Sequence, residues 1–492
     1  MSLADALADY PDEVPTAPAD VAGGLRGTRT VFVVFDDDPT GTQSVAGIPV
    51  LTRWQIEDFR AVFADAVAPV REDPSADLAW HAVYVLHNTR SVEADEAARR
   101  NEEAARNALD AAAEAGLSLV FASRSDSTLR GHFPLETDVL GRVLEESGAA
   151  VDAVIIVPAF PDAGRVTVGS EHFMVGTDGD LTRVSETEFA ADASFGFTTS
   201  FLPGYVEEKT EGRVSAAQVV PLTLATIRAG ASAVAEALGG VSGGAYVVAD
   251  TASEADLLTL SLGIAEAEAK GKQFLYRVGP PFMRARLGQE KKEPLTPAEI
   301  FGTGETAQAA LAERAPGGLI AVGSHVGMTT RQLTHLLTNG PGATEVELDV
   351  ARLLDPEQRE ACIAEATDAV CRAIAEHDAI IYTSRTLVRS EDRDESLRIS
   401  RLVSSGLTDV VNAVLTRVPP RFVVAKGGIT SSDVATEGLE IRRALARGPM
   451  LPGIISLWEA TDGPATGIPY VVFPGNVGTD ESLTDVVLTL HA

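Results

Sequence analysis

Short apolar, β-branched runs alternate with Ala- and Leu-rich stretches along most of the chain, and this alternation limits the fold more than any other feature of the sequence. Strand-then-helix order of this kind predicts parallel α/β sheets, with functional residues at the carboxyl ends of the strands. Strands are expected at 31–35, 82–86, 117–122, 153–157, 246–249 and 274–277, and again at 319–322, 345–349, 379–383, 422–425 and 470–473. Helices are expected at 92–115 with Ser91 as the N-cap, at 135–146 and 254–269, and at 330–337, 356–377 and 398–415.

The alternation weakens between Gly279 and Gly317, where the segments PP, KKEPLTP and APGG interrupt it. At about 150 residues per domain, the 492 residues of the chain also favour two or three domains. We therefore predict a loose Ala-, Asp- and Pro-rich arm at 1–28, an N-terminal domain at 29–285, a linker or insertion at 286–315 and a C-terminal domain at 316–492. The predicted fold class is α/β, with two lobes, mainly parallel sheets and a cleft between the lobes.

The charge of the chain excludes several classes of partner. Asp and Glu number 71 against 40 Lys and Arg, for a net charge of -31, which argues against nucleic acid and against anionic membranes. Lys is absent from the first 208 residues, and Lys426 is the only Lys among the last 200. A small anion bound in the first part must therefore be met by Arg, backbone amides or a metal.

The cysteines and the hydropathy indicate a reducing compartment. Cys362 and Cys371 are nine residues apart in one helical stretch, where a disulfide between them would be geometrically poor. With no secretory apolar region and no apolar run of about 20 residues, a cytoplasmic protein is expected. The oligomeric state is left open, a homo-oligomer included.

The segment Asp36-Asp37-Asp38-Pro39-Thr40-Gly41-Thr42 directly follows the first predicted strand. Pro39 and Gly41 predict a tight turn that exposes the three carboxylates, which would then need solvent, a cation or hydroxyl donors. A solvated acidic turn is the alternative without a function. The run also fits D-x-D-x-T of haloacid-dehalogenase-type phosphatases, with Asp36 as nucleophile, but that chemistry needs a later Lys and the first Lys is Lys209.

Arginines gather just beyond the ends of predicted strands. Arg124, Asp126, Thr128 and Arg130 stand together in the segment SRSDSTLRG. Arg90 in NTRS and Arg165 in PDAGR follow two further strands, a convergence that scattered surface arginines would not give. Arg binds carboxylates bidentately and Asp accepts sugar hydroxyls, so the set suits a polyhydroxylated anion. The alternative is a set of Arg–Asp pairs that only hold the loop, and His172 is expected to be a structural hydrogen-bonding residue.

The second half has three glycine loops at strand ends: Gly323-Ser324-His325, Lys426-Gly427-Gly428-Ile429-Thr430 and Pro474-Gly475-Asn476. Glycines let the backbone approach a phosphate, and hydroxyls and a Lys add donors and charge. We therefore expect a nucleotide here, with Lys426 contributing to its binding. The motifs H-E-x-x-H, paired C-x-x-C and G-x-S-x-G are absent, so zinc hydrolases and serine esterases find no support.

These segments together resemble the four-carbon acid sugar kinase family, enzymes that phosphorylate tetronates and 3-oxo-tetronates. The blocks that carry the resemblance span about residues 30 to 480 in the family's order: VFDDDPTGTQ, NTRS, SDSTLRG, PAFPDAGRVTVG, VSETEFAADASFGF, VVADTASEADL, VGSHVGMTTRQL, KGGITSSDV and FPGNVG. The resemblance implies an N-terminal sugar-acid domain that contains Asp36, Asp37, Arg90, Arg124, Asp126, Thr128 and Arg165. It also implies a C-terminal ATP domain that contains Ser324, Gly427, Gly428, Ile429, Thr430, Gly475 and Asn476.

The resulting hypothesis is ATP-dependent phosphorylation of a terminal hydroxyl of a short, four-carbon sugar acid. Asp37, and second Asp126, would orient or deprotonate the hydroxyl, while Asp36, Thr128 and the four arginines bind the substrate. Mg²⁺ would bridge the phosphates, and no residue is assigned as its ligand. Phosphoryl transfer depends mostly on positioning and charge neutralisation, so no strong nucleophile is needed. The alternatives are the phosphatase that uses Asp36 and a non-catalytic sugar-acid sensor.

Overall fold

The structure, a computed structural model, describes residues 1–384 and 393–491 and consists of two compact units, Met1–Lys291 and Lys292–Ala492. The division falls inside the segment 286–315 that was expected to be a linker. Each unit has its own apolar core. In the described chain, no helix is both long enough and apolar enough to cross a membrane.

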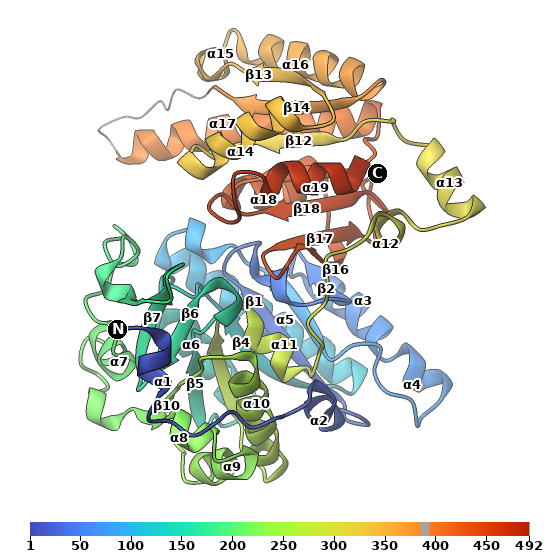
Figure 1. Cartoon of the computed structure of the whole chain (residues 1–492). Helices are drawn as coiled ribbons and strands as arrows, with labels where there is room; N and C mark the ends of the chain where they lie inside the picture. The colour runs from blue at the N-terminus through green and yellow to red at the C-terminus, as the bar shows by residue number, and fades with distance from the viewer. Residues whose placement is uncertain (385–392, 492) are drawn as a thin grey trace. The chain divides into compact units, whose positions relative to one another are not determined.

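The main sheet of the first unit is parallel throughout. Its strands are, in spatial order, β2 (Ile48–Leu51), β3 (Ala82–Leu86), β1 (Thr30–Asp36), β4 (Ser118–Arg124), β11 (Phe274–Val278), β5 (Ala153–Val157), β10 (Ala245–Ala249) and β9 (Val220–Leu222) (Figure 1). The register pairs Asp36 at the end of β1 with Leu86 of β3 and with Arg124 of β4. The segments that follow these three strands therefore begin at one edge of the sheet.

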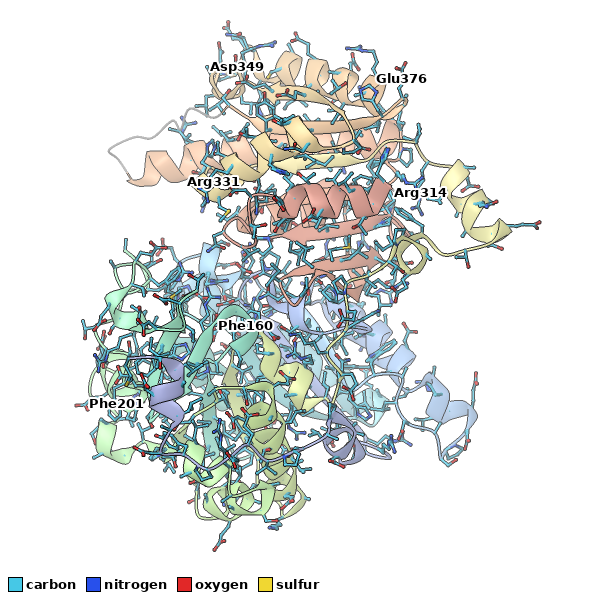
Figure 2. The ribbon with its side chains drawn as sticks, in the orientation of Figure 1. Phe160, Phe201, Arg314, Arg331, Asp349 and Glu376 are labelled. Atoms are coloured by element: carbon cyan, nitrogen blue, oxygen red, sulfur yellow. The ribbon has the colours of Figure 1, made fainter. Side chains whose placement is uncertain are left out.

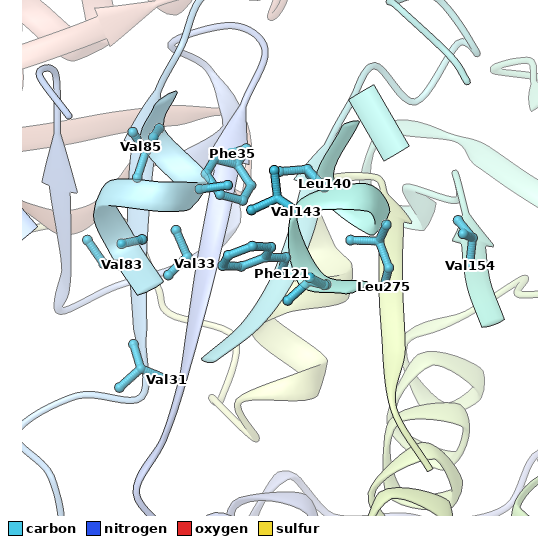
Figure 3. Packing of buried hydrophobic residues seen from close by; sticks show 14 of the residues in the cluster. Val31, Val33, Phe35, Val83, Val85, Phe121, Leu140, Val143, Val154 and Leu275 are labelled. Atoms are coloured by element: carbon cyan, nitrogen blue, oxygen red, sulfur yellow. The ribbon is translucent and has the colours of Figure 1, made fainter. Parts of the chain in front are cut away.

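Helices cover both faces of this sheet because its strands are apolar on both sides. On one face, alternate residues such as Val33, Phe35 and Phe121 pack against α3 (Ile56–Ala66), α5 (Ala94–Ala115) and α6 (Leu135–Glu146) (Figure 3). The other face carries α10 (Glu254–Ala269) and α11 (Pro280–Arg286), where the rings of Tyr276 and Phe282 lie 5.4 Å apart. Helix α5 has Glu93 as its N-cap, so the prediction of Ser91 is wrong: Ser91 ends the 3-10 helix Thr89–Ser91 instead.

A small antiparallel sheet, β6 (Arg165–Val168), β7 (Glu171–Val175) and β8 (Leu181–Arg183), adds to the first unit. The sequence did not predict it. Leu3 and Leu7 of helix α1 (Leu3–Leu7) pack against the apolar cluster of this sheet, and α2 (Pro18–Gly23) contacts α10. The expectation of a loose arm at 1–28 is therefore corrected, because apolar side chains of α1 are partly buried against the first unit.

The sheet of the second unit is parallel except at one side. Its order is β13 (Ala343–Leu348), β14 (Asp378–Thr383), β12 (Leu319–Val322), β15 (Val423–Lys426), β18 (Pro469–Phe473), β17 (Ile455–Ala460) and β16 (Arg443–Leu451). Strand β17 runs antiparallel to both of its neighbours, β18 and β16. Its helices are α12 (Pro297–Phe301), α13 (Glu305–Ala312), α14 (Gly327–Asn339), α15 (Val350–Leu354), α16 (Arg359–Ile374), α17 (Arg393–Arg417), α18 (Gly428–Asp433) and α19 (Ser482–His491). The predicted α/β class with mainly parallel sheets is confirmed.

Some acidic side chains at the surface of the second unit are paired with arginines or cap helices. Arg331 of α14, labelled in Figure 2, pairs with Asp480 at 2.8 Å, and both side chains are more than half exposed. Asp349, also labelled there, caps α15 by accepting from the backbone N–H groups of Ala351 and Arg352. Solvated carboxylates of this kind cost little in water, so the acidity does not conflict with a compact fold.

Candidate active site

Three segments meet at the edge of the first unit's sheet where β1, β3 and β4 end. The backbone N–H of Asp37 donates to the carbonyl of Arg124 at 3.3 Å, and the N–H of Arg90 donates to the carbonyl of Asp37 at 3.3 Å. The parallel register therefore brings Asp36–Asp38, the loop of Arg90 and the loop that begins at Arg124 into direct contact.

The aspartates at this edge are buried, so the expectation that the turn exposes them is wrong. Asp36 and Asp37 are each 2% exposed, and the side chain of Asp38 is 20% exposed. Arg124 pairs with Asp36 and lies 3.3 Å from Asp37, while Arg90 reaches Asp37 at 3.2 Å and Asp38 at 2.7 Å. Buried carboxylates need such counter-charges because the interior solvates ions poorly.

Gly41 explains why the turn can close over the buried pair. A Cβ at this position would overlap both carboxylate oxygens of Asp36 and the Nε of Arg124. Thr40 completes the turn, because its N–H donates to Asp38 Oδ1 at 2.8 Å and its hydroxyl bonds the same oxygen. Asp36 and Arg124, both expected to bind substrate, are placed as a buried pair beneath the turn.

Asp37 and Asp126 have opposite electrostatic environments. Burial raises the pKa of Asp37 to about 6, against the attraction of Arg90 and Arg124. Neither oxygen of Asp37 accepts a hydrogen bond from any described residue. Burial also opposes ionisation of Asp126, but Arg90, Arg130 and the Thr128 hydroxyl outweigh it and hold the pKa of Asp126 below its ordinary value. Two carboxylates whose pKa values are pushed apart are typical of an active site.

Arg130 lies at the outer side of this cluster. Its Nε donates to Asp126 Oδ2 at 2.6 Å, its NH1 lies 3.6 Å from Asp192, and its guanidinium is 4.8 Å from the ring centroid of Phe189. Thr128 donates its backbone N–H to Asp126 at 3.2 Å. The loop of Phe189 and Asp192 thus belongs to the site, and sequence reasoning missed both residues.

Arg165 differs from the other three arginines. Its NH1 donates to the Ala163 carbonyl at 2.8 Å, while its Nε is buried with no acceptor and no carboxylate pairs with it among the residues that the structure describes. His172 is fully buried and bonds Thr167 at 2.9 Å and the carbonyl of Ser127 at 2.8 Å. The structural role expected of His172 is confirmed, and Arg165 is left as the guanidinium available to an anion.

The second unit has a cavity of about 180 Å³ beside the Gly427–Thr430 loop. Apolar side chains form much of its lining: Val350, Ile399, Val403, Leu407 and Ile429. The rest of the lining is Gly323 and the polar residues His325, Thr383, Ser400, Ser404 and Thr430. The α15 and α17 residues of this lining were not predicted, because a helix shows in its sequence which residues are apolar but not which cavity they face.

The glycine loops pack closely at one end of this unit. The Thr329 hydroxyl lies 3.0 Å from both the Ser324 hydroxyl and the carbonyl of Gly475. A Cβ on Gly475 would lie 3.0 Å from the Ser324 oxygen, and one on Gly427, whose φ is +130°, would lie 3.0 Å from the Ser324 Cβ. Because glycine has no Cβ, the backbone at both positions can lie this close to the Ser324 side chain. Asn476 is exposed beside them.

Lys426 does not reach the surface, which corrects the expectation that it contacts the nucleotide. The residue is fully buried, its Nζ donates to the Pro474 carbonyl at 2.5 Å, and it lies 4.0 Å from the ring centroid of Phe473. Burial lowers the pKa of Lys426 to about 7. In this position the Lys426 side chain stabilises the turn before Gly475 through its hydrogen bond to the Pro474 carbonyl.

The described residues contain no cluster of three or more His, Cys, Asp or Glu side chains arranged to hold a metal ion. The carboxylates of Asp36–Asp38 are instead matched by arginines. In proteins, Mg²⁺ is commonly bound through one or two carboxylates together with the phosphates of a ligand, and it keeps several of its waters.

An Arg- and Asp-lined site in one α/β unit and a glycine-bordered cavity in another are together typical of a two-domain phosphotransferase. Residues 32–286 match the family of the sugar-binding N-terminal domain, and residues 319–483 match that of the nucleotide-binding C-terminal domain. The chain belongs to the four-carbon acid sugar kinase family, and it is a phosphotransferase with an alcohol acceptor.

Two relatives have names that describe an activity. The chain is 27% identical to a D-erythronate kinase from Heliobacterium modesticaldum over 350 residues. This aligned region covers 71% of this chain and 69% of that protein. It is 25% identical over 410 residues to a 3-oxo-tetronate kinase from Methylobacterium radiotolerans, covering 81% and 85%. Both relatives are kinases of four-carbon acids by name.

Solved structures share the fold. A protein from Salmonella typhimurium LT2 has a TM-score of 0.64 at 20% identity, over 92% of this chain and 98% of that one. A Haemophilus influenzae protein has a TM-score of 0.59 at 20% identity, over 94% and 100%. At this identity the likeness supports the two-domain α/β fold alone.

Proposed function

We propose that this chain transfers the γ-phosphoryl group of ATP to a terminal hydroxyl of a four-carbon sugar acid, such as a tetronate or a 3-oxo-tetronate. The oxygen of the hydroxyl attacks phosphorus, the bond from the γ-phosphorus to the β,γ-bridging oxygen breaks, and ADP leaves. The hydroxyl proton passes to a base. The names of the two kinase relatives support this substrate class.

The observation that carries the proposal is the state of Asp37. Its carboxylate is buried, accepts no hydrogen bond from the described residues, and has a pKa raised to about 6. A base works best when its pKa lies close to the operating pH. Asp37 is therefore assigned as the group that takes the hydroxyl proton, and Asp126, which stays ionised, as an acceptor for another hydroxyl of the substrate.

Arg165 is assigned to the substrate carboxylate. Arg90, Arg124 and Arg130 are already within ion-pair distance of aspartates, so their charge is largely balanced before any ligand arrives. Arg165 has no such partner among the described residues and carries a buried Nε without an acceptor. Burying this cation becomes favourable when a carboxylate pairs with it.

The nucleotide is assigned to the cavity of the second unit. Its mixed lining of aliphatic and hydroxyl side chains suits a base and a ribose. The phosphates are assigned to the glycine loops, where Ser324 and Thr430 lie against the backbones of Gly427 and Gly475. Mg²⁺ bound with ATP would neutralise the charge that develops on the phosphates.

The phosphatase alternative loses support from the geometry around Asp36. A phosphatase nucleophile needs a free carboxylate oxygen, but Asp36 is paired with Arg124 and both of its oxygens pack against Gly41. Lys209 bonds the carbonyl of Gly196 at 2.5 Å and pairs with no carboxylate of the Asp36–Asp38 segment. No observation favours the non-catalytic sensor.

One assay tests the proposal. ADP release is measured by a coupled enzyme reaction across a panel of four-carbon sugar acids, with and without Mg²⁺. The expected result is Mg²⁺-dependent ADP release with at least one acid, matched by phosphorylated product. Binding of an acid without ADP release would support a sensor, and phosphate release from a phosphoester without ATP would support a phosphatase.

A further inference from the structure

Behind the candidate active site lies a buried carboxylate that none of the assignments above uses. Glu136, in the first turn of α6, is 3% exposed. It accepts from the Thr89 hydroxyl at 2.5 Å and from the Ser123 hydroxyl at 3.1 Å, and Arg277 NH1 lies 3.4 Å away. Four-carbon acid sugar binding does not by itself require a buried acid at this place, so its presence calls for a reason.

Arg277, the partner of Glu136, reaches the same site from β11. It is 3% exposed, its NH2 lies 3.4 Å from the carbonyl of Arg130, and its guanidinium is 5.0 Å from the ring centroid of Phe133. A Cβ on Gly131 would lie 3.2 Å from Arg277 NH2 and 3.2 Å from Asp37 Oδ2. The Glu136–Arg277 pair and Asp37 are therefore separated by one glycine backbone.

The Glu136–Arg277 pair contacts three groups, and each of them belongs to, or directly precedes, an arginine of the candidate active site. Thr89 directly precedes Arg90, Ser123 directly precedes Arg124, and the third contact is the backbone of Arg130 itself. One buried ion pair thus ties together the three segments that carry the arginines around Asp37 and Asp126. A buried ion pair seldom stabilises a fold more than apolar residues of the same volume would, so stability alone does not account for it.

We propose that Glu136 is a positioning residue for phosphoryl transfer, which holds the loops of Arg90, Arg124 and Arg130 from behind and keeps Asp37 basic through its negative charge. This inference rests on the proposed function. The charged groups that face Asp37 are Arg90, Arg124, Arg277, Asp36, Asp38 and Glu136. The arginines favour the ionised form of Asp37 and the acids oppose it, so removal of one acid must make Asp37 a weaker base.

The test is the pH dependence of kcat/KM for the sugar acid in Glu136→Gln. Glutamine keeps the volume and an acceptor oxygen but removes the charge. The acid limb is expected near pH 6 in the wild type, and in Glu136→Gln it is expected to move down by about half a pH unit or more. At pH 8, kcat is expected to fall roughly ten- to a hundredfold from loop misplacement, with the KM for ATP unchanged within twofold.

Asp256→Asn is the matched control. Asp256 is also a buried carboxylate of the first unit, 1% exposed and paired with the buried Arg228 at 2.9 Å. The control loses the same charge from the same kind of pair, and its acid limb should stay at the wild-type position. An acid limb of Glu136→Gln that superimposes on the wild type, or an equal shift in Asp256→Asn, overturns the inference.

A second variant covers the case in which Glu136→Gln does not fold with Arg277 left unpaired. Glu136→Gln combined with Arg277→Met removes both charges of the pair. Its kcat is expected to stay at least tenfold below the wild type, and a value within twofold overturns the positioning role. The proposed function is judged separately, because it fails only if the wild type itself releases no ADP with any acid of the panel.

Discussion

Replacing Asp37 with asparagine should lower activity and raise stability at once. The side chain is buried and its pKa is raised from 3.8 to about 6. A carboxylic acid with a raised pKa binds its proton more tightly in the folded state than in the unfolded state. Asp37 therefore does not lower the free energy of unfolding below about pH 4, where the acid is protonated in both states. As the pH rises through the pKa of the folded state, the free energy of unfolding falls, because the buried side chain must then ionise.

The size of both effects follows from this shift. About two pKa units correspond to roughly 3 kcal/mol of destabilisation above pH 6, which the neutral amide would relieve. Arg90 and Arg124 keep Asp38, Asp126 and Asp36 as partners in the variant, so neither is left unpaired. Loss of a general base lowers turnover about 10²- to 10⁴-fold.

The assay has two parts, ADP release at pH 8 and thermal unfolding at pH 5 and pH 8. We expect Asp37→Asn to have a higher Tm than the wild type at pH 8, a smaller gain at pH 5, and the same affinity for ATP. Asp126→Asn is the control of opposite sign, because Asp126 has a lowered pKa in the folded state and its charge contributes stability above pH 4. Turnover of Asp37→Asn within threefold of the wild type would refute its role as the base, and a lower Tm at pH 8 would refute the electrostatic argument.

Three further predictions concern other parts of the two units. Gly41→Ala should destabilise the first unit by several kcal/mol, since the new methyl group overlaps the buried pair of Asp36 and Arg124; an unchanged denaturation midpoint would contradict this. Arg165→Met should raise the KM for the sugar acid at least tenfold and leave the KM for ATP unchanged, whereas Arg183→Met, on the mostly exposed strand β8 at the other side of the same small sheet, should change neither. Lys426→Met should raise the Tm of the protein at pH 6, because the folded pKa of this lysine is lowered to about 7 and charging it costs stability. That gain should shrink as the pH rises from 7 to 10.5, and a gain that is independent of pH would argue against a buried charge.

The sequence predicts the strands at the centres of the two sheets well, for a physical reason. Strands such as β3 and β5 are covered on both faces and appear as continuous apolar runs. The strands β2, β9, β16 and β17 and the strands β6 to β8 were missed. β7, β8 and β16 have many half-buried or exposed positions, which weakens their pattern, but β2 and β17 are almost fully buried and incomplete burial does not explain why they were missed. Their place depends on neighbours that are distant in the sequence.

The candidate site was predicted in part for the same reason. Residues that follow parallel strands must begin at one edge of a sheet, so the meeting of Asp37, Arg90 and Asp126 could be anticipated. The direction of each side chain could not be anticipated. Lys426 directly precedes a glycine loop, yet it points into the core and bonds Pro474.

The sequence by itself determined which residues stand at the ends of the strands: acids after β1, arginines after β3 and β4, and glycines after β15 and β18. Only the tertiary structure decided which of these charges are balanced. Burial and pairing depend on which distant segments close over a group, as Gly41 closes over Asp36 and Arg124. Those contacts balance the charges of Arg90, Arg124 and Arg130, and they leave Asp37 with a raised pKa and Arg165 with no carboxylate partner in the described structure.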